Sequence, residues 1–212
     1  MASILRRAAG DSRDTNRLEA FSDGVIAIAI TLLIIEIHVP DVKETEDGRH
    51  LWSHLWDLWP SYVGYLISFV VIGIMWANHH NIFGYIGRAN HTFVMLNLAL
   101  LFCVAFLPFP TAVLAQYLPS PEHRTAAAVL YGGTLTVTAV AYNAVWRYAA
   151  GGGRLLKRDA DRQLADAVTR EYRVGPFLYG AATLVAVLNV WASLAIHVFL
   201  AGLYVVPNRS RP

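Results

Sequence analysis

Polar and ionisable side chains open the first long apolar segment of the sequence. In the stretch RLEAFSDGVIAIAITLLIIEI, residues 17–37, Arg17, Ser22 and Asp23 precede a run that otherwise suits lipid. A carboxylate inside a membrane is costly unless it is paired or hydrated, so it marks a candidate site. We expect Asp23 to accept hydrogen bonds. The candidate donors lie in the second and third apolar segments: Trp76, Asn78, His79, His80 and Asn97.

The adjacent His79 and His80 invite a test for enzyme chemistry. Neighbouring residues on a helix point about 100° apart, so the two rings do not chelate one metal ion. The sequence contains neither HExxH nor GxSxG, the motifs of zinc proteases and serine hydrolases. We therefore expect no catalytic residues, no cofactor and no enzyme activity. The histidines are expected to form hydrogen bonds, with proton sensing as the alternative.

The composition places these residues in a membrane protein. The 212 residues are 56% hydrophobic and 15% charged, with a mean hydropathy of +0.42, whereas a soluble domain carries about 25% charge. A soluble core of this size could not hide so much apolar surface. The single cysteine, Cys103, lies within an apolar run and forms no metal motif. The sequence predicts an all-α integral membrane protein.

Six transmembrane helices are expected. Four segments can each cross about 30 Å of hydrocarbon as a helix, namely 18–39, 61–83, 92–117 and 124–149. The apolar region 174–206 is too long for one comfortable span and is interrupted around Asn189, Trp191 and Ser193. It predicts two short, tightly connected helices.

The distribution of basic residues supports this count. With the N-terminus inside, the inner segments hold fourteen of the seventeen Lys and Arg residues, as the positive-inside rule predicts. We expect a cytoplasmic tail at 1–16, a six-helix transmembrane domain at 17–206 and a cytoplasmic tail at 207–212. The domain includes a basic cytoplasmic loop at 150–173. Helical spacing there predicts a short amphipathic surface helix, with Leu156, Ala160, Leu164 and Ala167 or Val168 on its apolar face.

One stripe of the first helix is apolar except for a hydroxyl. At about 100° per residue, Ile28, Thr31, Leu32 and Ile35 share a face, and Phe21 with Gly24 continues it, while Asp23 points roughly the other way. From the spacing alone, ordinary helix packing explains such a stripe.

The sequence resembles the endolysosomal potassium channel family. Arg17, Phe21, Ser22 and Asp23 match its RxxxFSD signature, and the surroundings look like its prokaryotic members, which have one six-helix repeat per chain. The similarity extends to Trp76, His79, His80 and Asn97, and to the LPFP segment at 107–110. The first three helices match well, and the last three match mainly in hydropathy.

The resemblance implies a potassium-selective cation channel, modestly selective over sodium, in a prokaryotic plasma membrane. In that family four copies form a homotetramer whose first helices line a central pore. Ile28 takes the position of the apolar gate, Thr31 that of the hydroxyl linked to ion preference, and Leu32 and Ile35 those of further pore-lining residues. Potassium is then the permeating ion, with no other metal expected.

The polar residues receive a structural role in this hypothesis. Arg17, Ser22 and Asp23 would bond to Trp76, His79 or His80 and Asn97 and so fix the rotation of the first helix. The expected partners are further copies of the chain, lipid and monovalent cations, with no nucleic acid. A secondary transporter is the alternative function, because the bend at 107–110 and the short final helices suit broken transporter helices.

Overall fold

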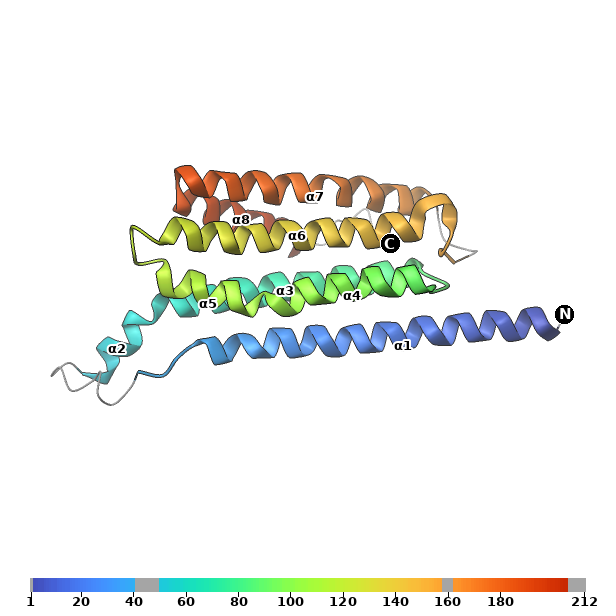
Figure 1. The fold of residues 1–212 in the computed structure, drawn as a ribbon, viewed down its shortest axis with the longest axis horizontal. Coiled ribbons are helices and arrows are strands. Elements are labelled where there is room, and N and C mark those ends of the chain that lie inside the picture. The colour runs from blue at the N-terminus through green and yellow to red at the C-terminus, as the bar shows by residue number, and fades with distance from the viewer. Residues whose placement is uncertain (1, 41–49, 158–161, 206–212) are drawn as a thin grey trace.

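The computed structural model describes residues 2–40, 50–157 and 162–205, and helices with short connections make up its secondary structure. A single isolated antiparallel bridge joins Ile86 and Leu156. The α-helices are α1 (Ala2–Leu32), α2 (Leu51–Asp57), α3 (Trp59–Tyr85), α4 (His91–Phe106), α5 (Pro108–Tyr117), α6 (Arg124–Ala150), α7 (Arg162–Leu188) and α8 (Val190–Val205). Figure 1 shows α1 along one side of the bundle and α7 with α8 on the opposite side. The all-α prediction is confirmed.

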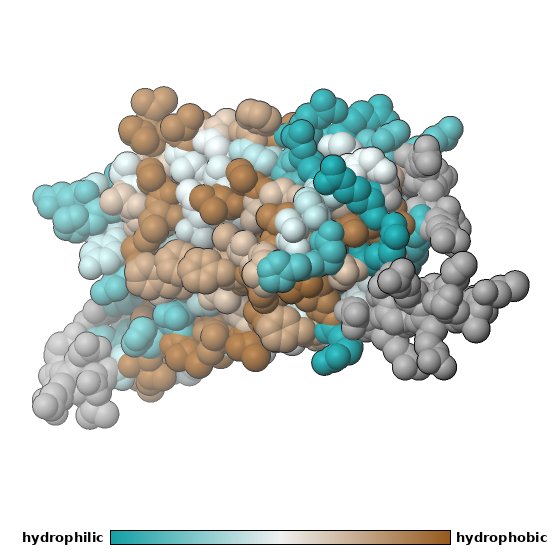
Figure 2. Space-filling view, turned by 45° about the vertical axis from the view of Figure 1, so that its right-hand side comes forward, coloured by the Kyte–Doolittle hydropathy of each residue, from teal (hydrophilic) through white to brown (hydrophobic). Residues whose placement is uncertain are grey.

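Four helical stretches are long and apolar enough to cross a membrane. They are Thr15–Glu36, Trp59–Tyr85, His91–Tyr117 and Arg124–Ala150, within a few residues of the four predicted spans. Figure 2 shows apolar side chains over the middle of the bundle and polar ones toward its ends. The predicted C-terminal tail, 207–212, lies outside the described residues.

The first span belongs to a longer helix than the sequence predicts. The helix α1 begins at Ala2, within the predicted tail, and its N-terminal part extends beyond the rest of the bundle (Figure 1). At its other end it tightens into a 3₁₀ turn, η1 (Leu33–Glu36). The buried face of α1 packs against α3 and α4.

The third span is broken at Leu107, between α4 and α5. Pro108 has no N–H to continue the helical ladder, and the N–H of Leu107 bonds instead to the carbonyl of Val104, at 3.2 Å. Leu107 keeps helical angles, φ −56° and ψ −35°, so the break is local. The two helices together still make one span of membrane length.

The prediction of a separate amphipathic helix followed by a short fifth helix is wrong. A single helix of 27 residues, α7, starts at Arg162 and runs through Pro176. The missing N–H of Pro176 frees the carbonyl of Tyr172, and the side chain of Asn143 on α6 donates to that carbonyl at 2.6 Å. This substitute bond allows the helix to continue. Leu156 lies outside it, and Ala160 lies outside the described residues. The last helix, α8, is short as predicted, with 16 residues.

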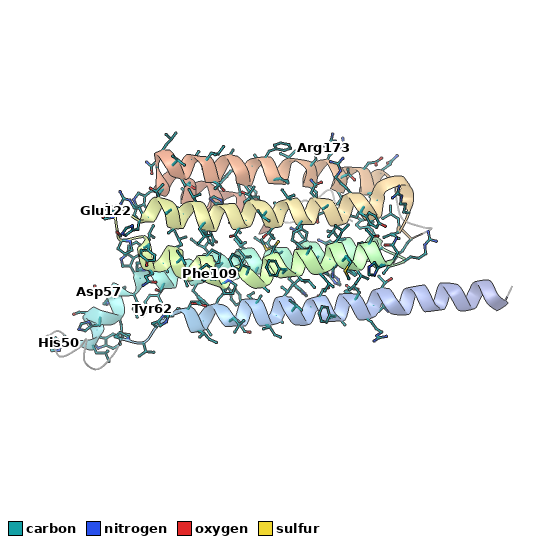
Figure 3. The ribbon with its side chains drawn as sticks, in the orientation of Figure 1. His50, Asp57, Tyr62, Phe109, Glu122 and Arg173 are labelled. Carbon is teal, nitrogen blue, oxygen red and sulfur yellow. The ribbon has the colours of Figure 1, made fainter. Side chains whose placement is uncertain are left out.

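Charged side chains lie at both ends of the bundle. Asp57 and Glu122 lie at the end formed by α2 and the turn between α5 and α6 (Figure 3). At the other end, the side chain of Arg88 donates to the carbonyl of Arg154 at 2.8 Å. Gly87 approaches Lys157 so closely there that an added Cβ would lie 3.1 Å from its Cα. These contacts tie the end of α3 to the end of α6.

Candidate functional site

A buried chain of hydrogen bonds joins the first three spans. The side-chain nitrogen of Asn97, on α4, donates to the hydroxyl of Ser22 on α1 at 2.9 Å. The amide oxygen of Asn97 lies 2.9 Å from Nε2 of His79 on α3. All three side chains are at most 1% exposed. Within this buried chain, Asn97 therefore links α1 to α3.

The direction of this chain follows from one backbone carbonyl. The hydroxyl of Ser22 donates to the carbonyl of Leu18, at 2.8 Å, so its oxygen must accept from the amide nitrogen of Asn97. The amide oxygen of Asn97 then faces His79, whose Nε2 must carry the hydrogen. The Nδ1 atom of His79 has no hydrogen-bond partner among the described residues. The imidazole stacks on Phe83, with ring centroids 4.4 Å apart.

Two more hydrogen bonds join α1 and α3 at the surface of the bundle. The indole nitrogen of Trp76 donates to Asp23 at 3.0 Å. Nδ1 of His80 lies 3.0 Å from the carboxylate of Glu19. The Trp76 and His80 rings stack, with centroids 6.2 Å apart. Because Trp76 and His80 are exposed and Glu19 and Asp23 are only partly buried, each pair contributes less than the buried chain.

The sequence left the partner of Asp23 open among several donors, and the structure pairs it with Trp76. His79 and Asn97 bond within the buried chain that ends on Ser22, and His80 bonds to Glu19. The sequence prediction missed Glu19. The spacing of Glu19, Ser22 and Asp23, at i, i+3 and i+4, puts all three on one helix face and could have indicated it.

Arg17 and Phe21 are not brought into this network. Both side chains are exposed, and Arg17 has no hydrogen bond or ion pair within the described part of the chain. They lie on the opposite face of α1, in line with Ile28. In addition, the described residues contain no group of three or more His, Cys, Asp or Glu that could hold a metal ion.

The apolar face of α1 is left uncovered by the rest of the chain. Ile28 is 61% exposed and Ile35 is 66% exposed, and Leu32 is also exposed. The opposite face of the same helix is packed, with Ile26 only 2% and Leu33 only 1% exposed. The polar network and this packed face together determine which side of α1 points away from the bundle.

Thr31 is the one hydroxyl among these exposed residues. Its Oγ1 donates to the carbonyl of Ile28, one helical turn earlier, at 2.9 Å. A hydroxyl has one proton and two lone pairs. Since the proton is used within the helix, the oxygen is left as an acceptor, which suits a cation or a water proton.

Helices of membrane length with a buried polar network between them define an integral membrane protein. A family model described as endosomal/lysosomal potassium channel TMEM175 matches residues 17–108, and relatives match nearly the whole chain. The chain belongs to the TMEM175 potassium channel family. This is a family of ion channels, so the chain is not an enzyme.

The similarity to individual members extends over about nine-tenths of the chain. A protein named potassium channel from Chamaesiphon minutus is 48% identical over 193 residues, which cover 91% of this chain and 94% of that protein. A protein named potassium channel from Streptomyces collinus is 40% identical over 191 residues, covering 90% and 91%. The crystal structure of a lysosomal potassium-selective channel TMEM175 homologue from Chamaesiphon minutus matches with a TM-score of 0.83 at 44% identity. It covers 91% of this chain and 97% of that chain.

Proposed function

We propose that this protein is a potassium-selective cation channel in which four copies surround a central pore lined by α1. The uncovered face of α1 carries the proposal, because it sets the acceptor oxygen of Thr31 among exposed apolar side chains, on a helix that the rest of the chain covers on one side only. Membership of a potassium channel family and the names of the relatives support potassium as the permeating ion.

The gate in this proposal is a ring of Ile28 side chains. Where apolar side chains from several copies narrow a pore, a hydrated ion would lose water without gaining ligands, so the constriction stays dry and closed. Leu32 and Ile35 extend the apolar lining beyond it. Conduction then requires the Ile28 side chains to move away from the axis.

Ion preference is assigned to Thr31. A ring of Thr31 oxygens, each with its proton donated to its own helix, offers lone pairs that replace part of the hydration shell of a cation. Neutral oxygens give a weak field, which favours K⁺ because K⁺ loses its water more easily than Na⁺. Selectivity of this kind is modest.

In this proposal, the polar network fixes the rotation of α1 about its own axis. The buried bonds among Ser22, Asn97 and His79, with the Asp23–Trp76 pair beside them, hold the packed face of α1 against α3 and α4. The opposite face, with Ile28 and Thr31, then stays directed toward the axis.

The membrane arrangement proposed for the chain adds α7 and α8 to the four long spans, which gives six. The end that holds Arg88 and Arg154 lies in the cytoplasm of a prokaryotic cell, in accord with the positive-inside rule. Both termini are then cytoplasmic.

Flux through reconstituted protein tests the function. Liposomes that contain the purified protein and a K⁺ gradient should pass a current that reverses near the K⁺ equilibrium potential, without any second substrate. Empty liposomes and liposomes with heat-denatured protein serve as controls. A flux that required a coupled substrate would contradict channel function and indicate a secondary transporter.

The variant Thr31→Val tests the origin of ion preference. Valine keeps the shape of threonine but lacks the hydroxyl, so the pore should still conduct while the preference for K⁺ over Na⁺ falls toward unity. The measurement is the reversal potential with K⁺ on one side and Na⁺ on the other. The matched control is Thr134→Val, since Thr134 is partly exposed and also donates to its own helix, at 2.9 Å, but lies on α6. A reversal potential unchanged in Thr31→Val would remove Thr31 from the selectivity mechanism.

A further inference from the structure

A mostly apolar groove lies between α3, α6 and α7, and its described lining includes no residue of α1. Its volume is about 60 Å³, several times the roughly 10–15 Å³ that one water molecule needs. Leu135 and Tyr142 on α6 are buried in it, whereas Ile74 on α3 and Pro176 on α7 are half-buried. The groove is therefore open at the surface of the bundle, and the proposed function makes no use of it.

The short α8 explains why this space is left open. This helix packs against α3, α6 and α7, but it has 16 residues, whereas each of those helices has 27. Figure 1 shows α8 ending near the middle of the bundle, while α6 and α7 continue past it. On α3 the groove runs from Val71, near the middle of the helix, to Asn78. It therefore extends toward the half of the bundle that α8 leaves unfilled.

Asn78 lies at the edge of the hydrocarbon layer. Trp59, at the start of α3, suits the opposite membrane interface. At 1.5 Å per residue, Asn78 is about 28 Å from Trp59 along the helix, close to the roughly 30 Å thickness of the hydrocarbon. His79, His80 and Asn81 follow it directly. The groove thus runs from the middle of the bilayer to the level of the lipid ester groups.

The side-chain amide of Asn78 lacks a partner within the described part of the chain, although Trp76, His79 and His80 beside it all form hydrogen bonds. The side chain is half-buried and lines the groove. A polar group beside hydrocarbon is costly without a hydrogen bond, and the amide N–H groups need an acceptor. An acceptor at the end of an apolar chain would satisfy both the amide and the groove.

We propose that the groove binds one acyl chain of a phospholipid, whose ester carbonyl accepts a hydrogen bond from the amide of Asn78. The chain then packs between α3 and α7 in the half of the bundle where α8 is absent. The inference rests on the proposed arrangement of copies around α1, because that arrangement leaves α7, on the opposite side of the bundle, in contact with lipid (Figure 1).

Water and the end of the chain itself fit the groove less well. Each ordered water needs two to four polar partners, and the hydroxyl of Tyr142 already donates to the carbonyl of Met75, so it offers no free proton. The last residues of the sequence, PNRSRP at 207–212, carry two arginines and no large apolar side chain. Such a segment does not match an apolar lining.

A density map of the wild-type protein in a phospholipid bilayer disc tests the proposal directly. The expected result is an elongated density in the groove, from the level of Val71 to the amide of Asn78, that is separate from the protein chain. An empty groove would overturn the proposal. So would density in the groove that is continuous with residues 207–212 or with a neighbouring copy.

Photo-crosslinking with a phospholipid that carries a diazirine in its acyl chain provides a second test. Labelling of residues 172–179 is measured relative to Leu184 and Val187, which are exposed on the same helix. The ratio should fall several-fold in Ala139→Phe, because the added ring occupies the groove that Ala139 lines. Val137→Phe is the matched control, since Val137 is 57% exposed on α6 and outside the lining, and it should leave the ratio unchanged.

Asn78→Leu tests the ester contact without filling the groove. Leucine is similar in size to asparagine but has no N–H to donate, so the labelling of residues 172–179 should again fall several-fold. An unchanged ratio in both Ala139→Phe and Asn78→Leu, with Leu184 and Val187 still labelled, would overturn the lipid site alone. Loss of labelling at Leu184 and Val187 in the wild type would instead contradict the arrangement around α1 on which the site rests.

Discussion

Replacing Ile28 with asparagine is expected to raise the resting K⁺ flux on the order of tenfold or more, because each 1.4 kcal/mol removed from a barrier is worth a factor of ten. In the proposed pore, the apolar Ile28 ring closes the path by staying dry, and an amide in that ring would bind water and let a hydrated ion pass. The measurement is the current or flux per protein chain in liposomes at matched protein density.

Ile34→Asn is the matched control for this variant. Ile34 is 54% exposed and Ile28 is 61% exposed, yet Ile34 lies in the 3₁₀ turn η1. At about 100° per residue in the α-helix and about 120° in the 3₁₀ turn, the two side chains point roughly 90° apart. The control should leave the resting flux close to that of the wild type. If Ile28→Asn leaves the flux unchanged, or if both variants raise it equally, Ile28 is not the gate.

Asn97→Leu is expected to lower the free energy of unfolding by about 2–5 kcal/mol, since each buried polar group left without a partner costs about 1–3 kcal/mol. Leucine is similar in size to asparagine but bonds to neither neighbour. The N–H of His79 loses its acceptor and the oxygen of Ser22 loses its donor. The midpoint of thermal unfolding and the fraction of assembled protein, both in detergent, measure the loss.

A positioning role also predicts what Asn97→Leu leaves unchanged. The protein that does assemble should show the wild-type ion preference, because Asn97 does not line the proposed pore. Met95→Leu, at an exposed position of the same helix, should be nearly neutral in both measurements. Wild-type stability combined with altered selectivity in Asn97→Leu would contradict the assignment.

The spans that could be predicted are those determined by their own hydropathy. Both α3 and α6 begin and end within two residues of the predicted bounds, because length and apolar content are local properties of the sequence. The continuation of α7 through Pro176 could not be predicted in this way. It depends on Asn143, which lies on another helix and supplies the bond that the proline removes.

The residues of the site could be predicted from the sequence, but the hydrogen-bond partner of each could not. Topology brings the ends of the first three spans together. This was enough to predict that Trp76, His79, His80 and Asn97 lie near the polar residues of α1. Several donors lay within reach of Asp23, and only the rotation of each helix determines which of them meets it. The same rotation explains why Glu19 joined the network, since it lies one turn before Asp23 on the same face.

A density map of the protein assembled in lipid tests the central claim most directly. The account predicts four copies around an axial opening, with Ile28 at its narrowest point and Thr31 exposed to the same opening. A map in which the Ile28 face of α1 contacts lipid, or in which no opening runs between copies, would contradict the account.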